Sequence, residues 1–224
     1  MPLLSVIVPV YNEANTIKQI LEKINSVDID KEIIVVDDGS YDDTGKILRK
    51  IKYNNLKIIH HASNRGKGAS VLTGLSRAEG EFVIIQDADL EYDPCDYLKL
   101  LGVIKDNTAD LILGARFIKG YKGLLIHRLG NRFLTNLLNF LFNVKLNDCF
   151  TCYKLSRRDT FNMLNLNAKG FDIEIEIIAQ ALKKNLRIKE VFVSYHPRSY
   201  SEGKKIRCKD GLKAAMSIIK YKLG

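Results

Sequence analysis

The first half of the chain alternates short apolar runs with helical patterns, and this alternation is its most restrictive feature. The runs LLSVIVPV, EIIVVDDGS, LKIIHH, EFVIIQ and ADLILGAR are short and rich in β-branched residues, which predicts buried strands. Between the first two, Ile17, Ile20, Leu21 and Ile24 recur at helical intervals of three and four. Strand and helix patterns alternate over residues 1–115, where DDTGKILRKIKY predicts a second helix, and LRIKEVFVSY predicts a further strand in the second half. This predicts an α/β fold whose mostly parallel central sheet carries helices on both faces.

Composition excludes several classes of protein. The chain has 224 residues and four cysteines, Cys95, Cys149, Cys152 and Cys208, which is too few for a disulfide scaffold of this size. Cys149 and Cys152 have CxxC spacing but lack a second ligand pair for zinc, and Phe150 and Thr151 between them are atypical of a redox motif. We therefore expect reduced, structural cysteines.

Charge divides the chain into two unequal halves. Residues 1–113 carry 13 lysines and arginines against 18 acids, net −5, whereas residues 114–224 carry 22 against 8, net +14. The acidic first half suits cation binding, and the basic second half suits binding to phosphate or to an anionic membrane. The acidic first half would repel DNA, and no basic and aromatic platform is present, so we expect no nucleic-acid partner.

Polar residues collect where the predicted strands end. In parallel sheets, ligands bind beyond the carboxyl ends of the strands. The GxGxxG and GxxxxGK[ST] signatures are absent, which argues against a hydride-transfer enzyme and a P-loop NTPase. The residues at these strand ends are instead rich in carboxylates, with a few cations and uncharged residues among them. They are Pro9, Tyr11, Glu13, Asp37, Asp38, Lys67, Asp87, Ala88, Asp89 and Arg116.

The stretch QDADLEYDP places four acids directly behind a strand. Asp87, Asp89 and Glu91 offer a hard oxygen site that suits Mg²⁺ or Mn²⁺, ions that usually take one or two carboxylates plus substrate phosphates. The alternative is a solvated acidic turn. For Asp93 and Asp96 we keep that alternative, because both complement the dipole of the helix that Pro94 opens.

Four segments, in this order and spacing, resemble one known family. They are LSVIVPVYNEANTI, EIIVVDDGSYDDT, NRGKGASVLTG and FVIIQDADLEYDP. They look like family 2 glycosyltransferases with the GT-A fold, and more narrowly like the dolichyl-phosphate mannose synthase-like polyprenyl-phosphate hexosyltransferases. DCFTCYKL, FDIEIEI and RSYSEGKKIRCKDG extend the resemblance over nearly the whole chain.

The resemblance implies that residues 1–115 are the nucleotide-sugar and metal-binding half, and residues 116–224 the acceptor and lipid half, of one continuous domain. It also implies roles for the residues at the strand ends. Pro9, Tyr11, Glu13 and Asp37 would line the nucleoside pocket, with Asp38 between the base and the metal. Asp87, Asp89 and Glu91 would hold the metal, although the family varies more at the position of Glu91. Arg198 and Lys204, six residues apart, would contact the donor diphosphate, and we assign Lys67 and Ala88 to the donor as well. The donor would be GDP-mannose in the first instance and UDP-glucose in the second.

The resemblance also implies a polyprenyl phosphate acceptor, and this gives the basic half a role. Arg116, Arg128 and Arg132 could grip a polyprenyl (dolichyl or undecaprenyl) phosphate, since arginine matches phosphate with a planar fork. Such a phosphate is largely ionised at pH 7 and needs no strong base. A saccharide hydroxyl acceptor would need a carboxylate base, for which Asp148 is the candidate, although Asp148 reads equally as a turn acid before a strand. We expect the catalytic set to be Asp89, Arg116, Arg128 and Asp148.

Two alternatives stay open beside lipid glycosylation. One is transfer to a saccharide hydroxyl, and the other is a non-catalytic sugar-nucleotide-binding module. Glu174 and Glu176 lie two apart on a predicted helix, so at most one is expected to reach the site.

Access to a lipid acceptor requires a membrane surface. Residues 123–142 form a basic amphipathic helix, with Leu125, Leu129, Phe133 and Leu137 along one stripe and Gly130 as a candidate break. This helix would dock on a membrane, pack on the domain, or do both. We see no signal peptide and no apolar run long enough to span a bilayer. We therefore expect a cytoplasmic protein that is peripheral on the inner face of the membrane.

Overall fold

The computed structural model describes residues 1–116, 125–198 and 208–223. Strands and helices alternate through the first half, as the sequence predicts. The strands are β1 (Leu4–Val10), β2 (Lys31–Asp37), β3 (Leu56–His60), β4 (Phe82–Ile85), β5 (Leu111–Ala115), β6 (Lys154–Arg157) and β7 (Ile188–Phe192). The helices are α1 (Ile17–Ser26), α2 (Thr44–Leu48), α3 (Lys67–Leu75), the 3₁₀ turn η1 (Pro94–Asp96), α4 (Tyr97–Lys105), α5 (Leu125–Phe142), α6 (Arg158–Met163), α7 (Ile173–Lys183) and α8 (Cys208–Leu223).

All seven strands form one sheet in the order β3-β2-β1-β4-β6-β5-β7. β1 pairs in parallel with β2 and β4, and β2 with β3. β6 is antiparallel to both of its neighbours, while β5 and β7 pair in parallel. Six strands therefore end at one edge of the sheet, and the loops that follow them meet there.

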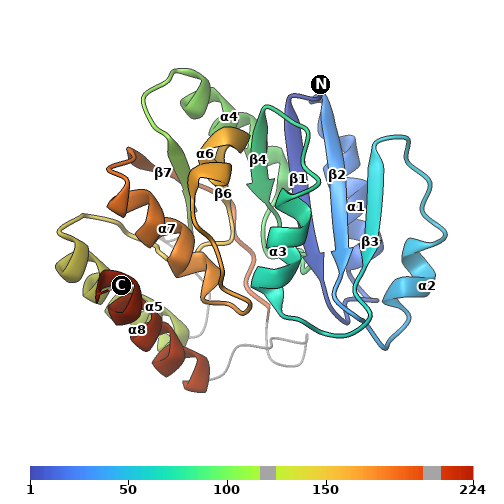
Figure 1. The fold of residues 1–224 in the computed structure, drawn as a ribbon. Coiled ribbons are helices and arrows are strands. Elements are labelled where there is room, and N and C mark those ends of the chain that lie inside the picture. Colours follow the sequence, from blue (N-terminus) through green and yellow to red (C-terminus); the bar gives the residue numbers. More distant parts are fainter. Residues whose placement is uncertain (117–124, 199–207, 224) are drawn as a thin grey trace.

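Helices cover both faces of this sheet (Figure 1). α3, α6 and α7 lie in front of the strands in that view, and α1 lies behind them. The strands β2, β4 and β5 are buried along their whole length, as expected for strands that are covered on both faces. Every predicted apolar position of α1 is fully buried. α3 packs closely on β1 because Gly74 has no side chain; a Cβ there would lie 2.4 Å from Cγ2 of Ile7.

Three elements differ from the sequence-based prediction. The pattern DDTGKILRKIKY forms only the five-residue α2, because the chain turns after Leu48 through short-range backbone bonds from Lys50 and Ile51. β7 ends at Phe192, since Ser194 donates its backbone N–H to Asp96 (2.6 Å) and leaves the sheet. α5 is not broken at Gly130 but continues for 18 residues.

α5 and α8 pack on each other, and α8 also packs on α7 (Figure 1). Their buried faces are built from Leu134, Leu138, Ala214, Ile218 and Tyr221. The stripe predicted for α5 is not the packed face: Leu129 and Phe133 are exposed by 58% and 66%. Each of the two helices therefore has a second apolar side that the rest of the described chain leaves exposed.

Candidate active site at the carboxyl edge of the sheet

The acidic stretch begins on a rigid support. Gln86 is fully buried, and its Oε1 accepts hydrogen bonds from the hydroxyls of Tyr97 (2.5 Å) and Tyr153 (2.6 Å). Four residues on, Leu90 has φ 65°, a left-handed conformation that is costly for a bulky residue. The end of β4 is therefore fixed, and the backbone turns sharply between Asp89 and Glu91.

Asp87 lies against a lysine from another loop. Its Oδ1 is 2.5 Å from Nζ of Lys67, the first residue of α3, and Lys67 also lies 2.8 Å from Oε1 of Glu174 on α7. Burial alone would raise the pKa of Asp87, but the charge and hydrogen bond of Lys67, a hydrogen bond with Cys152 and the charge of Lys154 together hold the pKa below its usual value. Asp87 therefore stays ionised at neutral pH.

At Asp89, the influences that raise the pKa outweigh the cation that lowers it. Nη2 of Arg198 donates to its Oδ2 at 2.9 Å, and Nη1 of the same guanidinium donates to Oε2 of Glu13 at 3.1 Å. Burial raises the pKa of Asp89, and the charges of Asp87 and Glu91 raise it further, to about 7, against the lowering by Arg198. Negative charge is in excess at this point.

Glu91 holds the segment that follows β7. Its Oε2 accepts from the Tyr195 hydroxyl (2.5 Å), its Oε1 accepts from the backbone N–H of Arg198 (2.8 Å), and its carbonyl accepts from the backbone N–H of His196 (2.8 Å). These bonds carry Arg198 to the acidic stretch. The geometry favours a positioning role for Glu91 over the ligand role that the resemblance implies.

The residues fit a divalent cation through two carboxylates. Within residues 1–116, 125–198 and 208–223, no three His, Cys, Asp or Glu side chains gather around one point. Asp87 and Asp89 are nevertheless hard oxygen donors on one turn, and burial and neighbouring negative charge raise the pKa of Asp89, which a divalent cation would offset. Such a pair matches ions that take most of their other ligands from phosphates and water.

The loops after β1 and β2 border the same edge. The Tyr11 and Tyr41 rings meet edge to face, with centroids 6.0 Å apart. Asp37 is buried, with Oδ1 accepting from the Ser40 N–H (3.1 Å) and Oδ2 lying 3.0 Å from Nδ1 of His60. Pro9 belongs to β1, and Ala88 lies buried between the two site aspartates.

Asp38 is occupied by the loop that leads into α3. Its oxygens accept from the backbone N–H groups of Arg65 (2.9 Å) and Gly66 (2.7 Å), and Oδ1 lies 2.6 Å from Nδ1 of His61. Gly66 has φ 95°, and a Cβ there would lie 2.3 Å from the carbonyl oxygen of Lys169. Asp38 therefore positions Lys67 by holding this loop.

Arg116 and Asp148 form a buried, two-pronged pair beyond β5. Nε of Arg116 donates to Oδ2 (2.7 Å) and Nη2 to Oδ1 (2.8 Å), while Asn131 of α5 donates to Oδ1 at 3.0 Å. Burial would raise the pKa of Asp148, but Arg116 outweighs it and the pKa is lowered. An ionised carboxylate with both oxygens engaged is better suited to orienting Arg116 than to accepting a proton.

The remaining cations lie on α5 or outside the described residues. Arg128 and Arg132 are exposed on either side of Asn131, which faces Asp148. The Arg116 guanidinium also stacks over the Tyr195 ring at 5.2 Å, so the basic half meets the segment that carries Arg198. Lys204 lies outside the described residues.

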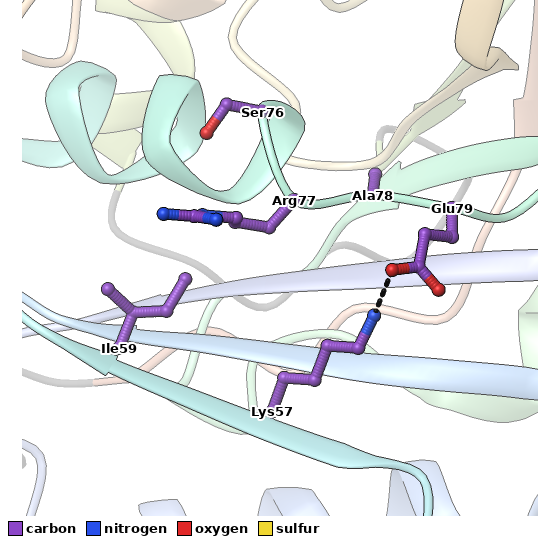
Figure 2. Close-up of a pocket in the computed structure, with 6 residues that line it drawn as sticks. All are labelled: Lys57, Ile59, Ser76, Arg77, Ala78 and Glu79. Atoms are coloured by element: carbon purple, nitrogen blue, oxygen red, sulfur yellow. Dashed lines mark ion pairs between the residues drawn. The ribbon is translucent and has the colours of Figure 1, made fainter.

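A pocket of about 490 Å³ lies at the opposite edge of the sheet, near the amino ends of β3 and β4 (Figure 2). Its lining includes Lys57 and Glu79, whose side chains form an ion pair of 2.8 Å across it. Its lining contains none of the acids and cations described above at the carboxyl edge. We therefore place the candidate active site at the carboxyl edge and not in this pocket.

Sequence reasoning missed several residues of the site. His60, His61, Tyr195 and Lys154 were not singled out. A signal existed for Lys154, because one lysine interrupts the apolar run around CYKL, and a cation in a buried strand requires a partner. Of the two helical glutamates, Glu174 reaches the site, whereas Glu176 accepts from the backbone N–H groups of Asn167 and Ala168.

Comparisons with known proteins agree with this architecture. The family model described as glycosyl transferase family 2 matches residues 5–164. The hexosyltransferase Agl6 of low-salt glycan biosynthesis in Haloferax volcanii is 30% identical over 204 residues, which cover 88% of this chain and 48% of Agl6. The chain thus spans about half the length of that relative.

Two further relatives extend the comparison. Polyprenol monophosphomannose synthase of Mycolicibacterium smegmatis is 27% identical over 89% of this chain and 79% of its own length. The structure of glucosyl-3-phosphoglycerate synthase from Mycobacterium tuberculosis, in complex with Mn²⁺, UDP and phosphoglyceric acid, has a TM-score of 0.77. It is 19% identical and aligns with 99% of this chain and 78% of its own, which shows a shared fold, the GT-A fold. From the extent of the family match, this chain belongs to glycosyl transferase family 2.

Proposed function

We propose that this chain transfers a hexose from a nucleoside diphosphate sugar to a polyprenyl phosphate, with inversion at the sugar carbon. The observation that carries the proposal is the pairing of Asp87 and Asp89 with two cations, Lys67 and Arg198, at the carboxyl edge of the sheet. Two anions flanked by two cations suit a diphosphate bridged by a divalent ion. GDP-mannose is the first candidate donor and UDP-glucose the second.

On the donor side, the nucleoside would lie against Pro9, Tyr11, Glu13 and Asp37. Asp87 and Asp89 would hold Mg²⁺ or Mn²⁺, which neutralises the charge of the departing nucleoside diphosphate. Lys67, Ala88 and Arg198 border the position of the diphosphate, and Lys204 completes the predicted set. The glucosyl-3-phosphoglycerate synthase complex, which contains Mn²⁺ and UDP, supports this assignment by analogy of fold.

On the acceptor side, Arg116, Arg128 and Arg132 would bind the lipid phosphate. An ionised phosphate is itself the nucleophile, so the protein's part is to hold two anions together and to exclude water. The name of the mycobacterial relative, which refers to polyprenol monophosphomannose, supports this acceptor.

The alternative acceptor is a saccharide hydroxyl, which would require a general base. Asp148 is the candidate for that role, but both of its oxygens are engaged and its pKa is lowered. A lowered pKa weakens a base, so this environment favours the phosphate acceptor. The Agl6 relative, a hexosyltransferase of glycan biosynthesis, keeps the alternative in view.

A membrane surface is the expected location of the acceptor. No helix among the described residues is both long and apolar enough to cross a bilayer. The exposed stripes of α5 and α8 consist of Leu129, Phe133, Phe140, Leu212, Met216, Ile219 and Leu223. Arg128, Arg132, Lys213 and Lys220 are exposed on the same two helices. Apolar stripes beside cations are typical of helices that lie on anionic membranes.

The test is transfer of labelled hexose from GDP-mannose and from UDP-glucose to a polyprenyl phosphate, counted in the organic phase with Mn²⁺ or with EDTA. We expect label in the lipid fraction with one donor and its loss with EDTA. Label that appears only on an added oligosaccharide would establish the saccharide alternative. Donor binding without transfer to either acceptor would favour the non-catalytic module.

A further inference from the structure

Four charges of alternating sign, of which Glu174 and Lys154 are buried, run from the acidic stretch into the second half of the chain. Lys67 bridges Asp87 (2.5 Å) and Glu174 (2.8 Å), and the second oxygen of Glu174 contacts Nζ of Lys154. Lys154 is fully buried on β6, and it also donates to the carbonyl of Thr151. The four residues come from four different elements or their ends, so only the folded chain assembles the row.

We propose that Glu174 and Lys154 are positioning residues that set the affinity of the Asp87–Asp89 pair for a divalent cation. They act through Lys67, the only member of the row that contacts Asp87 directly among the described residues. The inference rests on the proposed function, because it deepens the metal site assumed there. It assigns a task to two buried side chains that otherwise contact neither donor nor acceptor.

Asp87 and Glu174 compete for the positive charge of Lys67. A lysine paired with Asp87 alone would cancel the charge of that carboxylate and repel an incoming cation. Glu174 lies on the other side of the ammonium group and shares its charge, so Asp87 keeps more of its attraction for a cation. Because side-chain exposure is only 10% for Lys67 and 6% for Glu174, solvent screens these interactions weakly.

Lys154 moderates this competition because it also pairs with Glu174. Without it, Glu174 would have one cationic partner and would draw Lys67 more strongly away from Asp87. Lys154 cannot turn to water, because its side chain is completely enclosed and held by Glu174 and Thr151. Its charge therefore limits how strongly Glu174 attracts Lys67 away from Asp87.

This arrangement predicts opposite effects from the two ends of the row. Glu174→Gln removes a negative charge and leaves Lys67 to Asp87, so the affinity for Mn²⁺ falls. Lys154→Met removes a positive charge and releases Glu174 to Lys67, so the affinity for Mn²⁺ rises. We expect each shift in Kd to be about fivefold or more, and the double variant to return toward the wild-type value. A purely structural role would weaken binding in both single variants.

The experiment is a Mn²⁺ titration of the full chain, followed by the electron paramagnetic resonance signal of free Mn²⁺, with thermal unfolding measured on each variant. Glu176→Gln is the matched control. It lies on the same helix but binds backbone N–H groups of Asn167 and Ala168, so it should alter stability without moving Mn²⁺ affinity.

The outcomes separate this inference from the proposed function. Equal Mn²⁺ affinity in wild type and Glu174→Gln, or weaker binding in both single variants, would overturn the inference. So would a wild-type chain that binds no Mn²⁺. Should Lys154→Met fail to fold, the double variant, which removes a buried pair as a whole, still tests whether the loss in Glu174→Gln is reversed. Opposite shifts in a chain that transfers no sugar would leave the inference standing while the proposed reaction failed.

Discussion

The two edges of the sheet each bury a carboxylate, and they treat it in opposite ways. At the amino edge, Oε1 of Glu32 accepts from the Ser5 hydroxyl (2.6 Å) and from the N–H groups of Glu79 (2.6 Å) and Gly80 (3.1 Å). Its Oε2 lies 2.9 Å from Nζ of Lys57. Burial would raise the pKa of Glu32, but these contacts outweigh it and the pKa is lowered.

At the carboxyl edge the charges are left unbalanced. Asp89 has one guanidinium partner shared with Glu13, and burial together with two acids nearby raises its pKa to about 7. Leu90 adds an unfavourable backbone conformation next to it. The amino edge therefore stabilises the fold, whereas the carboxyl edge retains unbalanced charge and an unfavourable backbone conformation, as expected of the proposed site for a cation and a diphosphate.

The largest expected effect is the loss of sugar transfer on a substitution at the carboxyl edge. Asp89→Asn should reduce sugar transfer by about 100- to 1000-fold, because stabilisation of a leaving diphosphate by a bound metal contributes several kcal/mol. The free energy of unfolding should stay equal or rise, since like-charge repulsion is relieved. Transfer assays and urea denaturation measure the two quantities. Asp93→Asn is the matched control, as Asp93 only caps η1 through the Cys95 N–H (3.0 Å) and asparagine can do the same.

The corresponding change at the amino edge should reverse that pattern. Glu32→Ala removes the acceptor of the buried Ser5 hydroxyl and of the N–H of Glu79, which should lower the free energy of unfolding by about 2–3 kcal/mol. Transfer by the folded fraction should be unchanged. If Glu32→Ala abolished transfer while the chain stayed folded, the division of labour between the two edges would be wrong.

The pH dependence of stability sharpens the same contrast. A carboxyl whose pKa is lowered in the folded state stabilises above its unfolded pKa of about 4.3, and this stabilisation is lost as pH falls through the folded pKa. The stability difference between wild type and Glu32→Gln should therefore be constant near pH 7 and shrink in acid below about pH 4. Urea denaturation at a series of pH values measures this difference. A difference that instead grew toward acid would contradict the assignment.

The smallest effect concerns the rim of the amino edge. The Lys57 side chain is 42% exposed, and its contacts with Glu32 and Glu79 are partly screened by water. Lys57→Met should lower the free energy of unfolding by only about 0.5–1 kcal/mol, with the larger share traced to Glu32. A double-mutant cycle with Glu79→Gln separates the two contacts.

The sequence predicted the fold well where local patterns and tertiary structure agree. β1, β2, β4 and β5 are continuous apolar runs, and the four apolar positions of α1 are all buried. It could not predict that β6 enters the sheet antiparallel between β4 and β5, because that pairing joins residues about 70 positions apart. Nor could it predict the early end of α2, which is caused by the turn toward β3.

The site was predictable as far as strand ends go. Asp87, Asp89 and Arg116 each follow a strand, and parallel strands bring such residues together. The partners of these residues were not predictable, because Lys67 meets Glu174 and Glu91 meets Tyr195 only through long-range packing. Periodicity showed that Glu174 and Glu176 point apart, but not which one faces the acids.

The reversed strand β6 has a consequence for protein engineering. β6 from the second half pairs with β4 from the first, so strands from both sides of residue 115 are neighbours in the sheet. A fragment that stopped at residue 115 would expose the unpaired edge of β4. Exchanging the two halves between relatives at residue 115 would combine Lys154 from one parent with Lys67, Asp87 and Asp89 from another. Recombination that respects the topology should keep β4 and β6 from the same parent and place its junctions in the loops on either side.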